Sequence, residues 1–318
     1  MSRKNQRLDF LAAISGVMIA LQARANGELS HLIGNGVQAA LVSFGSGLLI
    51  IAVVAIFSPS IKAGARNLKG AVSRKELPKW TLFAGALGGS FVAVQTHIVP
   101  LIGVAIYSVA SIAGQTAASL VVDRIGLTGG GKKQITPRRI AAAFFTVFAV
   151  FISVFDRLDG RDLSLFAVLM GCVAGAIVGV QRALNGQINE HSNQSFTTSF
   201  LNFFMGTSFL FIFLLILVAV GPTEFVPLPS GPWWIYTGGV LGVIYIAFTS
   251  TIVQHLGVLT FTLFSVGGQL VGSLLIDLYS PTDGVSISVY LVTGIVMTYF
   301  GVVVGGVNNS QSRKRLTQ

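Results

Sequence analysis

Long apolar segments follow one another along the chain, each near the length that an α-helix needs to cross a bilayer. Short stretches containing glycine, proline or charged residues separate them. We therefore predict an all-α integral membrane protein with ten transmembrane helices. The predicted segments cover residues 8–25, 37–57, 81–99, 101–122, 139–155, 163–184, 197–220, 233–253, 256–278 and 286–306.

The first half of the sequence returns in the second half. Residues 16–47 align with 175–206 at a constant offset of 159, and residues 80–123 align with 234–277 at an offset of 154. The chain is therefore predicted to be one membrane domain, 1–318, that holds a five-helix unit twice, over 8–155 and 163–306. Because five is odd, the second unit enters the membrane from the opposite side, which gives inverted repeats.

A stripe of polar residues recurs at a spacing of four in both units. Positions four apart share one helix face, so each stripe forms a polar ridge roughly 18 Å long within an apolar helix. Polar groups in hydrocarbon are costly unless they face a cavity or another helix. The two ridges consist of Ser111, Gln115, Ser119 and Asp123, and of Ser265, Gln269, Ser273 and Asp277.

Two interpretations of the ridges stay open. The hydroxyls and the amides of Gln115 and Gln269 either line a substrate path or hold neighbouring helices together. Asp277 and Asp123 lie at span ends, where each is either a candidate for proton coupling or an ordinary ion-paired or helix-end residue. A central cavity lined by Ser111, Gln115 and their repeat equivalents would favour the path.

A second pair of polar residues also recurs. Gln22 and Asn26 share a helix face, as do Gln181 and Asn185, and a glycine that ends or loosens the helix follows each pair. They are either two pseudo-symmetric gates or helix caps that also bond to neighbouring helices. The polar residues after them are expected in loops beyond the first and sixth spans: Glu28, His31, Glu190 and His191.

Composition and charge support the membrane assignment. Hydrophobic residues make up 53% of the chain and charged residues 10%, and the mean hydropathy is +0.77. The net charge is +10, but 18 of 21 Lys and Arg fall on one side of the predicted membrane, including the basic tail 307–318. This bias places both termini in the cytoplasm, so the charge gives no reason to expect a nucleic-acid partner.

Several kinds of chemistry have no sequence signature here. The single cysteine, Cys172, excludes an intramolecular disulfide. There is no nucleotide-binding G-x-x-x-x-G-K-[ST], no metal motif and no G-x-S-x-G, so we expect no cofactor, no metal and no enzymatic activity. Gly171, Gly175 and Gly179 form a ridge that admits a close helix, either within the chain or in a second subunit of a homodimer.

The duplicated layout resembles the drug/metabolite transporter superfamily. The repeated Gln-x-x-x-Asn-Gly (Gln22 to Gly27, Gln181 to Gly186) and Gly-Gln-x-x-x-Ser-Leu-x-x-Asp (Gly114 to Asp123, Gly268 to Asp277) are similar to those of YdcZ-type inner-membrane exporters. Members of that family are often a single five-helix unit, so this chain resembles a tandem fusion. The resemblance implies a multi-pass transporter of the cytoplasmic membrane, with the bilayer and a small molecule as partners.

The expected function is alternating-access export of a small polar or amphipathic metabolite or drug. The ridges offer neutral hydrogen-bonding groups, which suits such a substrate. The alternative is a membrane scaffold or receptor that transports nothing, in which helix contacts satisfy the ridges and no cavity lies between them.

Overall fold

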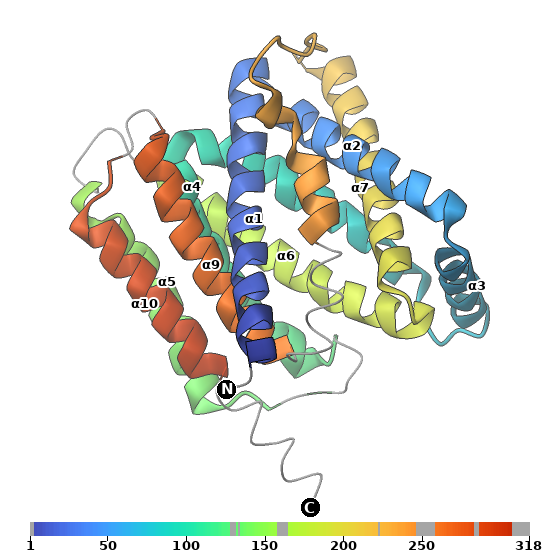
Figure 1. The fold of residues 1–318 in the computed structure, drawn as a ribbon, viewed down its shortest axis with the longest axis horizontal. Coiled ribbons are helices and arrows are strands. Elements are labelled where there is room, and N and C mark those ends of the chain that lie inside the picture. Colours follow the sequence, from blue (N-terminus) through green and yellow to red (C-terminus); the bar gives the residue numbers. More distant parts are fainter. Residues whose placement is uncertain are drawn as a thin grey trace, which may run out of the picture.

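The computed structural model describes residues 3–127, 132, 134–157, 165–221, 223–245, 258–282 and 286–306. Over these residues every regular element is a helix (Figure 1). The longer ones are α1 (Arg3–Ile33), α2 (Gly36–Phe57), α3 (Pro59–Ser73), α4 (Ala84–Ile125), α5 (Pro137–Ser153), α6 (Leu165–Ser192), α7 (Ser195–Val220), α9 (Val258–Tyr279) and α10 (Val289–Gly306). Short 3₁₀ helices are η1 (Lys79–Phe83), η2 (Phe155–Arg157) and η3 (Trp233–Tyr236), and residues 238–245 are helical.

Six helices are long and apolar enough to cross a membrane, counted over the described residues. The eighth predicted span, 233–253, lies partly outside them, and the tail 307–318 lies wholly outside. α5 and α10 are shorter than the other spans and pack side by side at one edge of the molecule (Figure 1). The structure thus shows an all-helical membrane protein.

α1 and α6 continue past the glycines at which the sequence suggested an end. α1 passes Gly27 and ends at Ile33, and α6 passes Gly186 and ends at Ser192. A turn of polar residues extends an already formed helix at little cost, because each added residue gains a hydrogen bond. The four residues expected in loops therefore lie on helices, which corrects that prediction: Glu28, His31, Glu190 and His191.

α3 lies between two of the predicted spans, 37–57 and 81–99. Ser58 caps its start by accepting a hydrogen bond from the N–H of Ile61 at 3.5 Å, and Pro59 occupies the first turn, where its missing N–H costs nothing. One face is buried and the opposite face carries exposed basic residues, which makes the helix amphipathic. The buried positions are Ile61, Gly64, Leu68 and Ala71, and the exposed basic ones are Lys62, Arg66 and Lys69.

α4 joins two predicted spans, 81–99 and 101–122, into one element with a break. The break is at Gly103, whose φ of 79° and ψ of 166° belong to a region that only glycine enters readily. Pro100 precedes it within the helix. The two predicted helices thus meet at Gly103, a few residues later than the predicted boundary, and the chain turns there without a connecting loop. Beyond the break, Val104 begins a second helical half.

The most extensive packing joins α6 to α4 and α1 to α9 (Figure 1). Both crossings depend on glycines that let backbones touch. A Cβ atom at Gly175 would collide with the carbonyl oxygen of Ser111, and one at Gly16 would collide with that of Ser265. Such close approach replaces the hydrophobic effect as the source of helix association in a bilayer.

These two crossings are equivalent under the repeat. Gly16 and Gly175 are equivalent at the offset of 159, and Ser111 and Ser265 are equivalent at the offset of 154. A second pair of collisions follows the same rule, with Gly114 against the Cys172 carbonyl and Gly268 against the Ala13 carbonyl. Helix bounds agree as well, since α9 spans Val258–Tyr279 and the second half of α4 ends at Ile125, 154 residues before Tyr279. Each unit therefore packs its first helix onto a late helix of the other.

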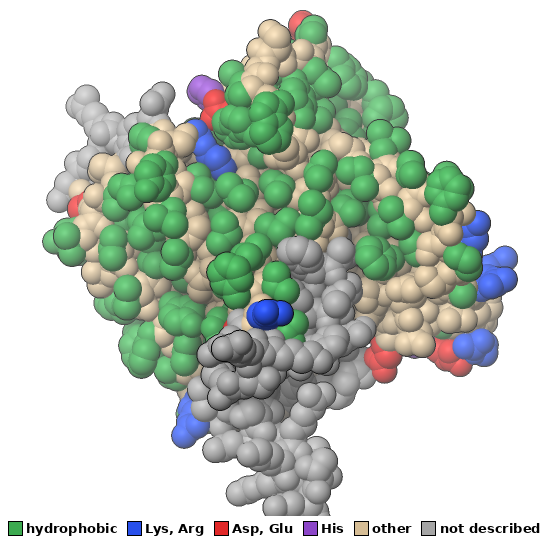
Figure 2. All heavy atoms as spheres, viewed as in Figure 1, with side chains coloured by type: hydrophobic (Ala, Val, Ile, Leu, Met, Phe, Trp, Pro, Cys, Tyr) green, Lys and Arg blue, Asp and Glu red, His purple; other side chains and the backbone are tan. Residues whose placement is uncertain are grey.

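Large hydrophobic side chains are exposed along the spans. Phe57, Phe166 and Val289 are examples, at 81%, 67% and 80% exposure. Figure 2 shows hydrophobic side chains spread over much of the described part of the face in view, with several Lys and Arg side chains at the edge formed by α3. An apolar surface of this extent is typical of contact with lipid.

Candidate functional site

The first polar ridge lies along the crossing of α4 and α6. Ser111 is 1% exposed, and its hydroxyl accepts a hydrogen bond from Nε2 of Gln115 at 3.1 Å. Oε1 of Gln115 accepts from Nη1 of Arg182 on α6 at 2.6 Å. Ser119 donates its hydroxyl hydrogen bond to the Thr116 carbonyl of its own helix at 2.7 Å. The ridge is therefore tied to its own helix and to α6.

The second ridge is more deeply buried. Ser265, Gln269 and Ser273 on α9 are 5%, 7% and 0% exposed. The Ser273 hydroxyl donates to the Leu270 carbonyl at 2.9 Å, as a serine in an apolar helix commonly does. Since Gly16 packs on the carbonyl of Ser265, this ridge lies against α1. The two ridges thus occupy equivalent crossings.

The two aspartates of the ridges have different surroundings. Asp277 is 2% exposed, and its carboxylate accepts hydrogen bonds from the backbone N–H groups of Val104 and Ala105 at 3.1 and 2.7 Å. These N–H groups begin the second half of α4, where a helix has unpaired donors and a partial positive charge. Asp277 therefore caps the helix that restarts after Gly103.

Asp123 instead pairs with a cation. Arg139 of α5 donates to its carboxylate, and the Asp123 and Arg139 side chains are 15% and 18% exposed. The ion-paired role expected for Asp123 is present, with Arg139 on another helix as a partner. The pair joins the end of α4 to the start of α5.

The amide pair of the second repeat belongs to a hydrogen-bonded triad. Nε2 of Gln181 donates to Oδ1 of Asn202 at 2.9 Å, and Nδ2 of Asn202 donates to Oδ1 of Asn185 at 2.6 Å. The same Nδ2 also donates to the Thr198 carbonyl at 3.1 Å. The triad links α6 to α7 through side chains alone.

The equivalent amide pair of the first repeat has no such triad. Asn26 is 0% exposed, and neither Oδ1 nor Nδ2 of its amide has a hydrogen-bond partner among the described residues. Its amide lies against Gly238, where a Cβ atom would also approach Oγ of Ser43 at 2.7 Å. Ser43 is the repeat equivalent of Asn202 and is too short to supply both missing bonds.

Sequence reasoning missed a group of buried polar residues near the break in α4. Tyr107 and Ser108 are each 1% exposed, and their hydroxyls have no hydrogen-bond partner among the described residues. Gln95, 3% exposed, lies on the first half of the same helix. None of the three belongs to a repeated polar motif. In the sequence, they are marked only as polar side chains inside a predicted span.

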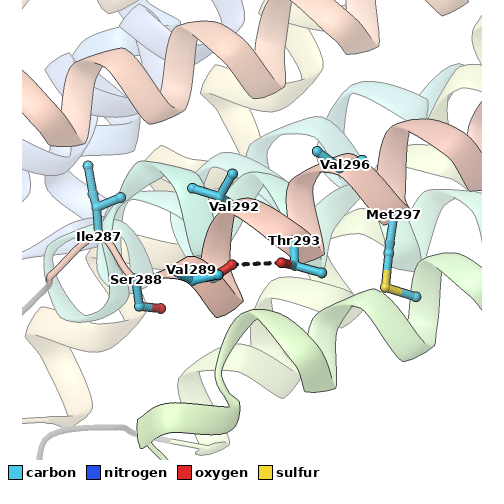
Figure 3. A pocket seen from close by; sticks show the side chains of 7 residues that line it. All are labelled: Ile287, Ser288, Val289, Val292, Thr293, Val296 and Met297. Atoms are coloured by element: carbon cyan, nitrogen blue, oxygen red, sulfur yellow. Dashed lines mark hydrogen bonds between the residues drawn. The ribbon is translucent and has the colours of Figure 1, made fainter.

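Two of the cavities formed by the described residues are lined by residues outside the ridges. One, of about 460 Å³, follows α10 and is lined by Ile287, Ser288, Val289, Val292, Thr293, Val296 and Met297 (Figure 3). Its polar groups are engaged, since Thr293 donates to the Val289 carbonyl at 2.8 Å and Ser288 accepts from the Leu291 N–H at 3.2 Å. The other, of about 660 Å³, lies near the turn between α1 and α2.

Arg24 and the glycine ridge of α6 also have partners inside the chain. Arg24 forms an ion pair with Glu28 at 3.2 Å and donates to Oγ of Ser280 at 3.0 Å. The glycine ridge of α6 packs on α4, with Gly171 against Ala110 and Gly175 against Ser111. The close neighbour of that ridge is therefore a helix of the same chain, so the ridge no longer argues for a homodimer.

Comparison with known proteins decides the family. The family described as "Putative inner membrane exporter, YdcZ" matches residues 8–152 and 166–304. The chain belongs to this family. The two matched segments agree with a tandem fusion of two family units, as the internal repeat predicted. None of the curated proteins matches the chain.

A solved structure shares the fold of this YdcZ-family protein. It is described only as "Crystal structure of protein", is 15% identical in sequence and superimposes with a TM-score of 0.51. The match covers 96% of this chain and 98% of the other. At this identity the likeness concerns the fold alone.

Proposed function

We propose that this protein is a secondary transporter that exports a small polar or amphipathic metabolite or drug by alternating access. Its ten transmembrane helices form two inverted five-helix repeats in the cytoplasmic membrane, with both termini in the cytoplasm. The family, a group of membrane exporters, supports the general class. The substrate and the mechanism are the proposal.

The equivalence of the two crossings is the observation that carries the proposal. Gly175 on Ser111 and Gly16 on Ser265 are one contact made twice, by helices of opposite repeats. Two repeats that make equal contacts can adopt two arrangements of similar energy. In the second arrangement, each repeat has the conformation that the other had in the first. A rocking motion of one unit against the other converts one arrangement into the other.

The amide clusters are the gates in this proposal. Gln181 and Asn185 are bonded through Asn202, whereas the amide of Asn26, beside Gln22 on its own helix, has no hydrogen-bond partner among the residues that the structure describes. We assign the bonded cluster to the closed gate and the unbonded cluster to the gate on the other side of the membrane. Exchange of conformations would break the bonds of one cluster while the other closes.

The two ridges are the walls of the path, and Asp277 and Asp123 are the candidates for proton coupling. Gln115 and Gln269 supply amides that a polar substrate group can bond once the crossings separate. The contacts of Asp277 with Val104 and Ala105 favour a capping role in the arrangement seen here. Coupling through Asp277 therefore requires the second half of α4 to move away from it.

One observation favours a membrane scaffold or receptor instead. The hydroxyl of Ser111 and the amide of Gln115 are engaged with each other and with Arg182, and neither cavity reaches them. A scaffold requires only such helix contacts. Transport requires that they open.

A screen of compound efflux distinguishes the two functions. Cells that express the wild type are compared with cells that express the double variant Gln115→Leu, Gln269→Leu, at equal amounts of membrane-inserted protein. Gln134→Leu is the control, because Gln134 is an exposed glutamine between α4 and α5. We expect at least one compound that the wild type and the control expel and the double variant retains. If all three proteins treat every compound alike, the transport path does not include the ridges and the scaffold gains support.

A further inference from the structure

The cavity of about 660 Å³ lies at the end of the molecule where α1 turns into α2. Its walls come from this turn, the first half of α4, the start of α6, the end of α7 and the segment after α7. Its volume is within the range of small-molecule sites in proteins. The lining residues that the argument uses are Asn35, Ala93, His97, Met170, Phe213 and Glu224.

Hydrogen bonds between elements hold the walls in place. The Thr96 hydroxyl donates to the Gly36 carbonyl at 2.8 Å, which fixes the turn to α4. The Gln38 amide donates to the Val226 carbonyl at 2.5 Å and accepts from the Val226 N–H at 3.1 Å, which fixes the segment after α7 to α2. The walls of the cavity are thus fixed to one another by hydrogen bonds, and a preformed site of this kind binds with little ordering cost.

The lining combines apolar walls with a few polar groups. Met170 and Phe213 represent the apolar majority. Glu224 is the single carboxylate of the lining, and no lysine or arginine contributes to it. Nδ2 of Asn35 has no hydrogen-bond partner among the described residues, although Oδ1 of the same side chain caps α2. This donor is buried, whereas Glu224 is exposed, so the carboxylate is the polar group of the lining that a ligand reaches.

We propose that this cavity binds an amphipathic organic cation. The apolar body of the ligand contacts Met170 and Phe213, and its positive group lies toward Glu224. The repeat equivalents of Asn35 and His97 are Gln194 and Thr251, so the site belongs to one end of the molecule and not to both. It is separate from the ridges, and the proposal holds whether or not the protein transports the ligand.

Binding of tetraphenylphosphonium tests the proposal. The purified full-length protein in nanodiscs of zwitterionic lipid is titrated with the labelled cation, and partition into empty nanodiscs is subtracted. Tetraphenylborate, which has nearly the same shape and the opposite charge, is titrated in parallel. We expect saturable binding of the cation at one site per chain and no saturable binding of the anion.

Variants then locate the site. Glu224→Gln should weaken the cation about tenfold, because it removes the charge-assisted contact. Glu190→Gln, an exposed carboxylate at the end of α6, is the matched control and should bind as the wild type does. Ala93→Trp fills the cavity and should abolish saturable binding.

The outcomes separate this proposal from the transport proposal. Equal affinity in wild type, Glu224→Gln and Ala93→Trp, or no saturable binding of the cation at all, overturns the cation site and leaves the efflux screen unaffected. Asn35→Ser keeps a capping oxygen for α2, so it should leave binding of tetraphenylphosphonium unchanged, since that cation binds through its charge and its aromatic rings. A large loss of binding in this variant would mean that the turn and not the carboxylate governs the site.

Discussion

The two amide clusters are the clearest contrast between the two halves of the molecule. Both contain the same Gln-x-x-x-Asn-Gly motif on equivalent helices, α1 and α6. In the second half, Asn202 bonds to both members of the motif, whereas in the first half Ser43 occupies the equivalent position and the Asn26 amide is buried without a partner among the described residues. Thus the residue at one position of the neighbouring helix, Asn202 or Ser43, decides whether the amides of the motif are hydrogen-bonded.

The aspartates show the same effect. Asp277 and Asp123 end the same repeated motif, yet one caps a half-helix and the other forms an ion pair. A buried carboxylate bonded to a helix N-terminus is held more strongly than a partly exposed ion pair. The repeats are therefore equal in how their helices cross and unequal in how their polar groups are satisfied.

The crossings should tolerate substitution least. Gly175→Leu and Gly16→Leu each force a side chain into a carbonyl of the partner helix, and each should cost about 3 kcal/mol or more. The measurement is thermal unfolding in detergent, together with the yield of monodisperse protein. Gly186→Ala is the control, because nothing lies within 4 Å of a Cβ atom there. A marked loss for Gly175→Leu with none for Gly16→Leu would contradict the equality of the two crossings.

The next largest effect on stability should come from the two aspartates, and it should differ between them. Asp277→Asn removes the charge from two hydrogen bonds in a buried site and should cost about 1.5–3 kcal/mol. Asp123→Asn removes a partly exposed ion pair with Arg139 and should cost less than about 1 kcal/mol. Chemical unfolding in mixed micelles gives both values. Equal losses would show that the cap of α4 is no stronger than the ion pair.

Exchanging the residues at positions 43 and 202 tests why the two amide clusters differ. Asn202→Ser gives the second cluster the residue of the first and should cost about 1–2 kcal/mol, since Gln181 and Asn185 lose their partner. Ser43→Asn supplies the missing partner of Asn26 and should stabilise by about 1 kcal/mol. Asn189→Ser, an exposed amide on α6, should leave thermal stability unchanged. Destabilisation by Ser43→Asn as large as that by Asn202→Ser would refute the assigned cause.

The smallest effect belongs to a segment that only the first repeat has. After α3, Arg74 donates two hydrogen bonds to Glu76 at 2.8 and 2.9 Å and lowers the pKa of that carboxyl. A lowered folded-state pKa gives stability above the unfolded pKa, and this stability is lost as the pH falls through the folded value. The pair is fully exposed, so Glu76→Gln should shift the melting temperature at neutral pH by an amount close to experimental error and not at all in strong acid. A clear shift at neutral pH would mean that this turn supports the fold.

The sequence by itself determined the class, the repeat and the family. Apolar length and composition are local properties, so they predict membrane helices without knowledge of packing. The offsets of 159 and 154 predict which residues are equivalent, and at these offsets Gly16 and Gly175 make the same kind of contact, each with the carbonyl oxygen of a serine. The motifs that indicated an exporter family were also read from the sequence, and the family match confirms them.

Only the tertiary structure decided what the polar residues touch. Asp277 caps α4 because residues 172 and 173 positions away in the chain come within hydrogen-bond distance of it, and no local pattern contains that information. The same holds for Asn26 and Asn185, which belong to identical motifs. Their hydrogen bonding differs because their neighbours on α2 and α7 differ. Helix formation depends on near neighbours, whereas the satisfaction of a buried polar group depends on a partner that the fold brings from elsewhere.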